Sequence, residues 1–82
     1  MFISAIYHNK YTHNEAGTTF TIEDDYVFSS VCDLSDFLDM IIPSIERERD
    51  DNEYVYITFH DESTSIDIDL AYIDELGQVT IY

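Results

Sequence analysis

The last third of the sequence alternates between apolar and polar residues, and this alternation constrains the fold more than any other feature. It runs through two segments, Glu53 to His60 and Ser65 to Ile73. Successive side chains of a β-strand point to opposite faces, so each segment predicts a strand with one buried face and one exposed face. The residues between them, Asp61 to Thr64, predict the turn of a hairpin.

One register of this hairpin places its apolar side chains on a single face. The expected pairs are Phe59 with Ile66, Ile57 with Ile68, and Val55 with Leu70. Tyr72 is expected on the same buried face and Ala71 on the other. A second turn at Asp74-Glu75-Leu76-Gly77 predicts a third strand to Tyr82, with Tyr72 opposite Val79 and Leu70 opposite Ile81. The exposed face is then expected to carry five residues: Tyr56, Asp69 and Tyr82 side by side, with Thr58 and Asp67 next to them.

The middle of the chain has a helical period. Four apolar residues fall within one arc of a helical projection, flanked by Phe37 and Ile42, and they are Leu34, Leu38, Ile41 and Ile45. Asp36, Asp39, Pro43 and Glu46 fall on the opposite side. This pattern predicts an amphipathic helix with Asp33 as its N-cap and an end near Arg49. Pro43 is expected to kink this helix or to restart it, because proline has no N–H to donate.

The first third predicts two further strands. Residues 2–8 are apolar and β-prone, and residues 18–22 alternate strictly, with His8 to Gly17 as the loop between them. Residues 26–28 either extend the second strand or form a packed loop. The expected fold class is therefore α+β, with one domain over residues 1–82. It has a mostly antiparallel five-stranded sheet and one amphipathic helix on one face, in the order ββαβββ.

The charge of the chain is far from balanced. Eighteen acidic residues face three basic ones, Lys10, Arg47 and Arg49, which gives a net charge of −15. Residues 1–22 carry only Lys10 and Glu15, so the whole net charge lies in residues 23–82. Direct binding of nucleic acid depends on Lys and Arg neutralising phosphates, and this composition argues against it. The single cysteine, Cys32, and the lack of a signal-like start predict a cytoplasmic protein.

Metal binding and catalysis have little support in the sequence. The three histidines and Cys32 do not have the spacing of a zinc site. The carboxylate pairs Asp67/Asp69 and Asp24/Asp25 would need burial to separate their pKa values for acid–base work. No nucleophile or phosphate-loop motif is present in the sequence. We expect no enzyme activity, no cofactor and no metal.

The acidic surface, together with two tyrosines, is the candidate interface. Taken singly, these acids are what a solvated helix face or an ordinary turn contains, but soluble proteins usually mix both signs of charge on their surface. The expected partner-binding residues are Glu23, Asp24, Asp25, Asp36, Asp39, Glu46, Tyr56, Asp61, Glu62, Asp67, Asp69, Asp74, Glu75 and Tyr82. Neighbouring acids on a strand or helix are about 5–7 Å apart, which is comparable to successive phosphates on a nucleic-acid strand.

In size, charge and cytosolic character the chain resembles the small acidic DNA-mimic inhibitors of phages and mobile elements, a class that includes anti-restriction and anti-CRISPR proteins. Over residues 18–73 the order of elements is also similar to that of uracil-DNA glycosylase inhibitors, including the strand that runs into Asp61-Glu62-Ser63-Thr64. The Glu-Ser-Ile of that family's first strand is replaced by Ile22-Glu23-Asp24-Asp25, so Glu23 stands where its key glutamate would be. The family's leading helix is replaced by the predicted strand at residues 2–8. The resemblance implies a basic, nucleic-acid-binding partner such as a CRISPR effector, a DNA-repair enzyme or a restriction enzyme.

Two alternatives remain open from the sequence. Asp51-Asn52-Glu53-Tyr54 is similar to a segment of cloacin-type immunity proteins, which implies an immunity protein or antitoxin that neutralises a basic nuclease. A charged solubility or scaffold protein is the other alternative. The outer strand from Val79 to Tyr82 has an edge at which two copies could pair as a homodimer.

Overall fold

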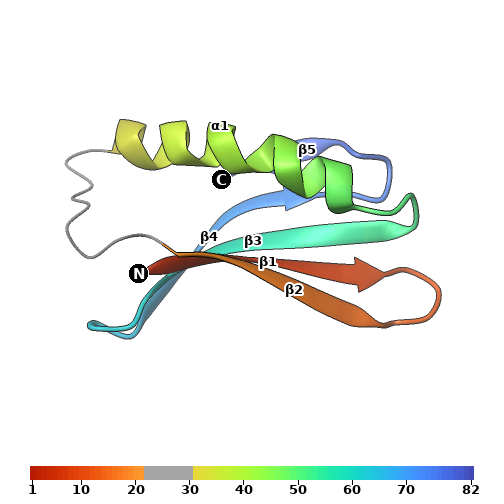
Figure 1. Cartoon of the computed structure of the whole chain (residues 1–82), viewed down its shortest axis with the longest axis horizontal. Coiled ribbons are helices and arrows are strands. Elements are labelled where there is room, and N and C mark those ends of the chain that lie inside the picture. The colour runs from red at the N-terminus through yellow and green to blue at the C-terminus, as the bar shows by residue number, and fades with distance from the viewer. Residues whose placement is uncertain (22–30) are drawn as a thin grey trace.

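The chain forms one sheet and one helix in a computed structural model, which describes residues 1–21 and 31–82 (Figure 1). The elements, in chain order, are β1 (Phe2–Asn9), β2 (Glu15–Thr21), α1 (Val31–Glu48), β3 (Glu53–Asp61), β4 (Ile66–Ile73) and β5 (Val79–Ile81). The strands lie in the order β2-β1-β3-β4-β5, and every neighbouring pair is antiparallel. The predicted fold class and the ββαβββ order are confirmed.

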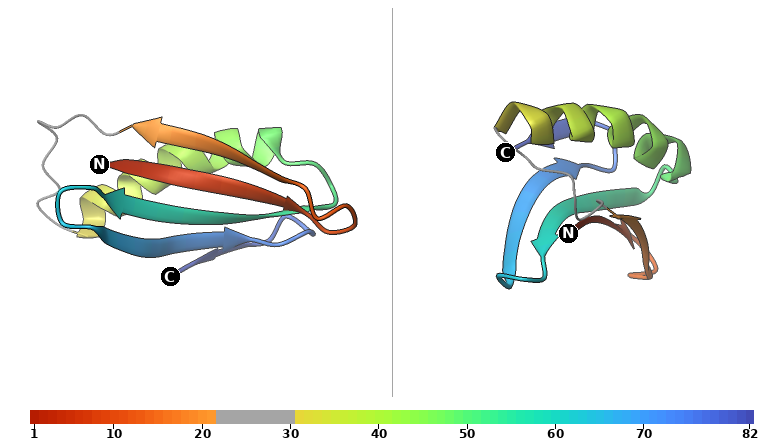
Figure 2. Two further views of the ribbon diagram at one scale, coloured as in Figure 1. Left: turned by 90° about the horizontal axis from the view of Figure 1, so that it is seen from below. Right: turned by 60° about the vertical axis from the view of Figure 1, so that its left-hand side comes forward.

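The molecule has two layers, with α1 packed across one face of the sheet (Figures 1 and 2). Among the described residues, the core between the layers is entirely apolar apart from one tyrosine hydroxyl. Its buried residues are Ile3, Ala5, Tyr7, Leu38, Ile41, Ile42, Ile45, Val55, Ile57, Phe59, Leu70, Ala71 and Ile73. The helical period predicted the contributions of α1, and strand alternation predicted those of β3. The helix covers only one face, so the other face of the sheet is open.

The register of the β3–β4 hairpin differs from the expected one. Phe59 lies opposite Ile68 instead of Ile66, because the four-residue turn lies one residue later than expected, at residues 62–65, where Ser65 adopts a left-handed φ of 58°. Ile66 and Ile68 remain on the helix side of the sheet, but they are 48% and 47% exposed. Figure 2 shows the cause, since this end of the hairpin bends away from α1.

A β-bulge opposite Ile57 and Thr58 changes the register again. As a result, the side chains at the end of β4 lie on the opposite faces of the sheet from those expected. Ile57 pairs with Ala71 and Thr58 with Asp69, so Leu70 is the extra residue. One extra residue turns all following side chains to the other face. Ala71 is therefore buried and Tyr72 lies on the open face. On β5 the pairs are Ile73 with Val79 and Ala71 with Ile81, one residue away from the prediction.

The first hairpin is longer than predicted, because β1 extends to Asn9 and β2 begins at Glu15. Asn9 explains the tight turn, since its side-chain oxygen accepts hydrogen bonds from the backbone N–H groups of Tyr11 and Thr12, both at 2.9 Å. His13 takes a positive φ of 60° in the same turn. Asparagine and histidine tolerate these conformations better than most residues, which sequence alternation does not reveal.

The helix α1 also differs in detail from the prediction. It begins at Val31, so Asp33 lies inside the helix and is not its N-cap. It continues through Pro43 to Glu48 as one element, so the expected restart does not occur. Residues 26–28, whose structure the sequence left open, lie outside the described residues. In the described part of the chain, no helix is both long and apolar enough to cross a membrane.

Candidate functional site: the open face of the sheet

The face of the sheet opposite α1 is a regular grid of side chains from four strands, which we call the open face. Strand register gives its four rows. Read from β2 to β4, they are Glu15-His8-Tyr54, then Gly17-Ile6-Tyr56-Tyr72, then Thr19-Ser4-Thr58-Asp69, and finally Thr21-Phe2-His60-Asp67. None of these residues is fully buried. The open face therefore presents aromatic, hydroxyl and carboxylate groups together.

An aromatic cluster occupies the first two rows. The Tyr56 ring is 5.2 Å from that of Tyr72, 5.3 Å from that of His8 and 5.8 Å from that of Tyr54. The His8 ring also stacks on Tyr54 at 5.1 Å, and His8 Nδ1 lies 3.2 Å from a carboxylate oxygen of Glu15. Tyr56 remains 46% exposed in spite of these contacts. Tyrosines packed in this way form a rigid platform that loses little entropy on binding.

Burial within this cluster acts on Tyr72. It raises the pKa of the Tyr72 hydroxyl, and the nearby Tyr56, Glu75 and Asp74 add to the effect in that order. The direction is the one expected when a phenolate would be partly desolvated and close to carboxylates.

A hydrogen-bonded network fills the last two rows. Ser4 Oγ lies 2.7 Å from His60 Nε2, and His60 Nδ1 lies 2.7 Å from Asp67 Oδ1. Phe2 stacks on the His60 ring at 4.6 Å. Because a carboxylate can only accept, Nδ1 carries a hydrogen, and Nε2 of the neutral ring accepts from the Ser4 hydroxyl. The network fixes both the orientation and the tautomer of His60.

Serine hydrolases use the same order of groups, with serine as the nucleophile and histidine as the base. They also need donors for the oxyanion, and the loss of a single donor costs about 10²–10³ in kcat. Ser4 lies on β1, which is paired on both edges, so its backbone N–H groups point toward neighbouring strands and not toward the surface. The backbone of β1 next to Ser4 therefore offers no free N–H group to an oxyanion, and the network holds His60 in place.

The acids of α1 form a second surface on the other side of the molecule. Asp36, Asp39 and Glu46 are all exposed, as predicted from their helical positions. Met40, between them on the helix, is 73% exposed. Because α1 covers the inner face of the sheet, its outer side and the open face point in opposite directions (Figure 2). One partner that binds a flat face of this protein therefore meets only one of the two surfaces.

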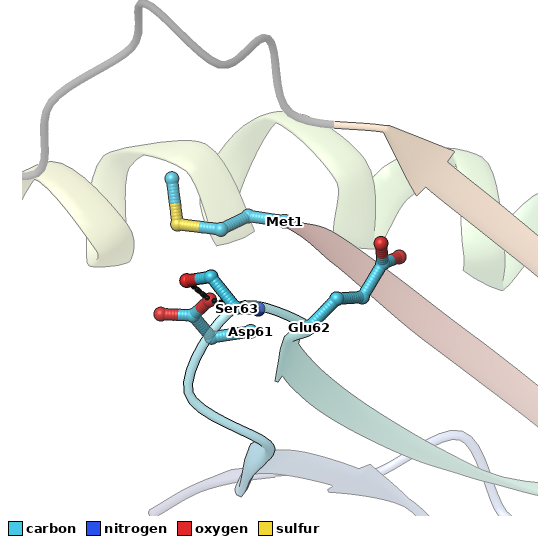
Figure 3. Close-up of a pocket in the computed structure, with 4 residues that line it drawn as sticks. All are labelled: Met1, Asp61, Glu62 and Ser63. Carbon is cyan, nitrogen blue, oxygen red and sulfur yellow. Dashed lines mark hydrogen bonds between the residues drawn. The ribbon is translucent and has the colours of Figure 1, made fainter.

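The acids of the β3–β4 turn have a local structural role. Asp61 Oδ1 accepts hydrogen bonds from the Ser63 hydroxyl at 2.7 Å and from the Ser63 N–H at 3.1 Å (Figure 3). The hydroxyl bond is the main reason why the pKa of the Asp61 carboxyl is lowered. Asp61 also lines a hollow of about 320 Å³, together with Met1, Glu62 and Ser63. These described lining residues contribute two carboxylates, one hydroxyl and one apolar side chain.

The acids of the β4–β5 turn lie at the opposite end of the sheet. Asp74 Oδ1 accepts from the N–H groups of Leu76 at 3.0 Å and Gln78 at 2.8 Å, and Gly77 supplies the expected positive φ of 85°. The Glu75 carboxylate is 3.5 Å from the ammonium group of Lys10. Asp74 and Glu75 are therefore explained by the turn and by the Lys10 contact.

Tyr82 has a different position from the one expected. Its N–H donates to the carbonyl oxygen of Leu70 at 2.9 Å, and its side chain is 70% exposed. The neighbour of Tyr56 across the strands is Tyr72 instead, and Asp69 lies one row further along, opposite Thr58. The expected row of Tyr56, Asp69 and Tyr82 is therefore wrong. Glu23, Asp24 and Asp25 lie outside the described residues.

The structure thus divides the predicted site residues among the open face, the outer side of α1 and two turns at opposite ends. Four further residues belong to the open face and were not among the predicted site residues: His8, Tyr54, Tyr72 and His60. Alternation on β3 could have identified Tyr54 and His60, which share a face with Tyr56. In the part of the chain that the structure describes, no three His, Cys, Asp or Glu side chains are grouped as a metal site. No known protein family, curated protein or solved structure matches the chain.

Proposed function

We propose that this protein is an acidic inhibitor that occludes the positively charged nucleic-acid-binding site of another protein. It acts as a DNA mimic of the kind that phages and mobile elements use against a CRISPR effector, a restriction enzyme or a repair enzyme in the host cytoplasm. The observation that carries the proposal is the uncompensated negative charge of the surface. A net charge of −15 on 82 residues destabilises the compact fold through self-repulsion. Binding to a cationic partner is a function that would account for this charge.

The three basic side chains do little to neutralise this surface, because they are three against 18 acids and each is held by a local contact. Lys10 contacts Glu75, and the Arg47 guanidinium donates to the Ser44 hydroxyl at 3.1 Å. Arg49 Nη1 donates to three backbone carbonyl oxygens at the end of the molecule, those of Asp50, Glu53 and Glu75. The acids of the α1 outer side and Asp69 on the open face are exposed, and none of them forms an ion pair with one of these three basic residues.

The location of the acids supports the same proposal. No charged residue of the described chain is buried, so the described carboxylates are available at the surface. An extended negative surface of this kind accelerates the association with a basic groove and makes the affinity strongly dependent on salt. The tyrosines of the open face add the packing contacts that charge alone does not provide.

The proposal is tested by competition. The protein is immobilised to capture partners from a host extract, and each captured nucleic-acid-binding protein is assayed for displacement of its nucleic acid. We expect displacement that weakens steeply as salt rises, and we expect polyglutamate of the same net charge to compete far less well. A partner that binds its nucleic acid undisturbed at saturating inhibitor would contradict the proposal. A captured nuclease toxin whose active site is blocked would instead favour the immunity-protein alternative.

A further inference from the structure

The open face has the chemistry of a guanidinium-binding surface. Resting on the function proposed above, we infer that it is the docking surface and that it selects arginine over lysine side chains of the cationic partner. The groups that make this selection are the Tyr56 and Tyr72 rings and the Asp69 carboxylate. The remaining carboxylates of the protein attract any cation without distinguishing between the two.

The first element of this inference is the pair of tyrosine rings. Tyr56 and Tyr72 lie directly opposite each other on β3 and β4, with ring centroids 5.2 Å apart and planes 39° apart. The contacts of Tyr56 with His8 and Tyr54 hold it in place, while almost half of it stays exposed. A ring that is fixed and exposed suits a planar guanidinium, which stacks on aromatic faces.

The second element is the carboxylate next to the rings. Asp69 pairs with Thr58, which follows Tyr56 on the same face of β3 at a distance of about 7 Å along the strand. The Thr58 hydroxyl donates to Asp69 Oδ1 at 3.5 Å, which is a long contact. An arginine side chain stacked on Tyr56 can therefore extend its planar fork to an exposed carboxylate and bind it in a bidentate manner. The ammonium group of lysine cannot form both contacts in this geometry.

The outer side of α1 does not offer this combination. Its acids are accompanied by Met40 and Pro43, whereas Phe37, the one aromatic residue described on α1, packs against the core. It provides charge without a stacking platform, so it should attract arginine and lysine equally. The three basic side chains do not belong to the rows of the open face, since they are in the β1–β2 turn, near the end of α1 and just after it. Of these, Lys10 lies beside Glu75, a carboxylate near Tyr72, and this carboxylate 3.5 Å away offsets the charge of Lys10.

The inference is tested with two peptides of equal length, an oligoarginine and an oligolysine, titrated into the protein at low salt and neutral pH. We expect oligoarginine to bind about fivefold more tightly or better, which is the scale of one exposed cation–π contact. Tyrosine ring signals in NMR should shift at Tyr56 and Tyr72. The variant Tyr56→Leu keeps an apolar side chain on the strand, and it should bring the arginine-to-lysine ratio close to one.

A matched pair of charge variants locates the surface. Asp69→Asn and Asp39→Asn each remove one exposed carboxylate, one on the open face and one on α1. We expect Asp69→Asn to reduce the selectivity for arginine and Asp39→Asn to leave it unchanged. Equal binding of the two peptides to the native protein, or selectivity that survives Tyr56→Leu, would overturn the inference and leave the proposed function intact. If neither peptide binds, the proposed function itself fails.

Discussion

The buried hydroxyl of Tyr7 predicts a specific loss of stability at alkaline pH. Tyr7 lies under the end of α1, is only 5% exposed and donates to Glu48 Oε2 at 3.4 Å. Burial and the Glu48 carboxylate raise its pKa from 10.0 to about 12. The folded protein therefore holds this proton more tightly than the unfolded chain does. Its contribution is complete below pH 10 and is lost as the pH rises through 12.

The size of this effect follows from the shift. Each pKa unit corresponds to about 1.4 kcal/mol, so the two units between 10.0 and about 12 correspond to about 3 kcal/mol in the free energy of unfolding. Domains of this kind have about 5–15 kcal/mol in total, so the loss is large enough to measure.

The assay is urea unfolding followed by circular dichroism between pH 8 and pH 12, for the native protein and for Tyr7→Phe. All other ionisable groups are the same in both proteins, so their contributions cancel in the difference. At pH 8 the variant should lose at most about 1 kcal/mol, because the hydroxyl makes one long hydrogen bond. At pH 12 that difference should disappear or reverse. Glu48→Gln should show a smaller alkaline loss than the native protein. Equal losses in the native protein and Tyr7→Phe from pH 8 to pH 12 would refute this reasoning.

Three further predictions concern the core, a turn and the net charge. Ile45 is fully buried on the side of α1 that faces the sheet. Ile45→Ala should lower the free energy of unfolding by about 2–5 kcal/mol, as measured by urea unfolding. A loss below about 1 kcal/mol would contradict this packing. Gly77→Ala places a Cβ 2.9 Å from Arg49 Nη2 at a φ of 85°. This change should lower the free energy of unfolding by about 1–3 kcal/mol. Gly17→Ala should lower it less, because Gly17 has no positive φ and its new Cβ lies 3.1 Å from Ile6 Cδ1, a flexible side-chain end. If thermal unfolding shows the larger loss for Gly17→Ala, the proposed role of Gly77 in the turn is wrong. The 18 acidic residues repel one another, and only three basic residues offset them. The melting temperature should therefore rise as the salt concentration increases from about 0.01 M to about 1 M, because the screening length falls about tenfold. A melting temperature that falls would show that the charges stabilise the fold.

The elements of the fold were predictable because their patterns are local. The amphipathic period of α1 identified Leu38, Ile41 and Ile45 as core residues, and strand alternation identified β3 and β4. The turn at Gly77 was predictable from the need for a positive φ. These features depend on a few neighbouring residues and on simple steric rules.

The composition of the candidate site was less predictable, because it depends on register. The extra residue at Leu70 moves Tyr72 to the open face. The alternation of apolar and polar residues in the sequence does not predict such a bulge. The neighbours of Tyr56 come from three strands, and the pairing of β1 with β3 joins residues that are far apart in the sequence. His60 and Ser4 form a network that only this pairing creates. Residues 1–22 carry no net charge, yet β1 and β2 supply half of the strands of the open face.

The central claim is that this protein displaces nucleic acid from a cationic partner through the open face. The most direct test measures the inhibition constant for this displacement with two variants that each add one positive charge, Thr58→Lys in the middle of the open face and Met40→Lys on the outer side of α1. We predict that Thr58→Lys weakens inhibition about tenfold or more, because it places a buried cation at the interface, whereas Met40→Lys weakens it only slightly through long-range charge. Inhibition by Thr58→Lys equal to that of the native protein, or a larger loss with Met40→Lys, would contradict the claim.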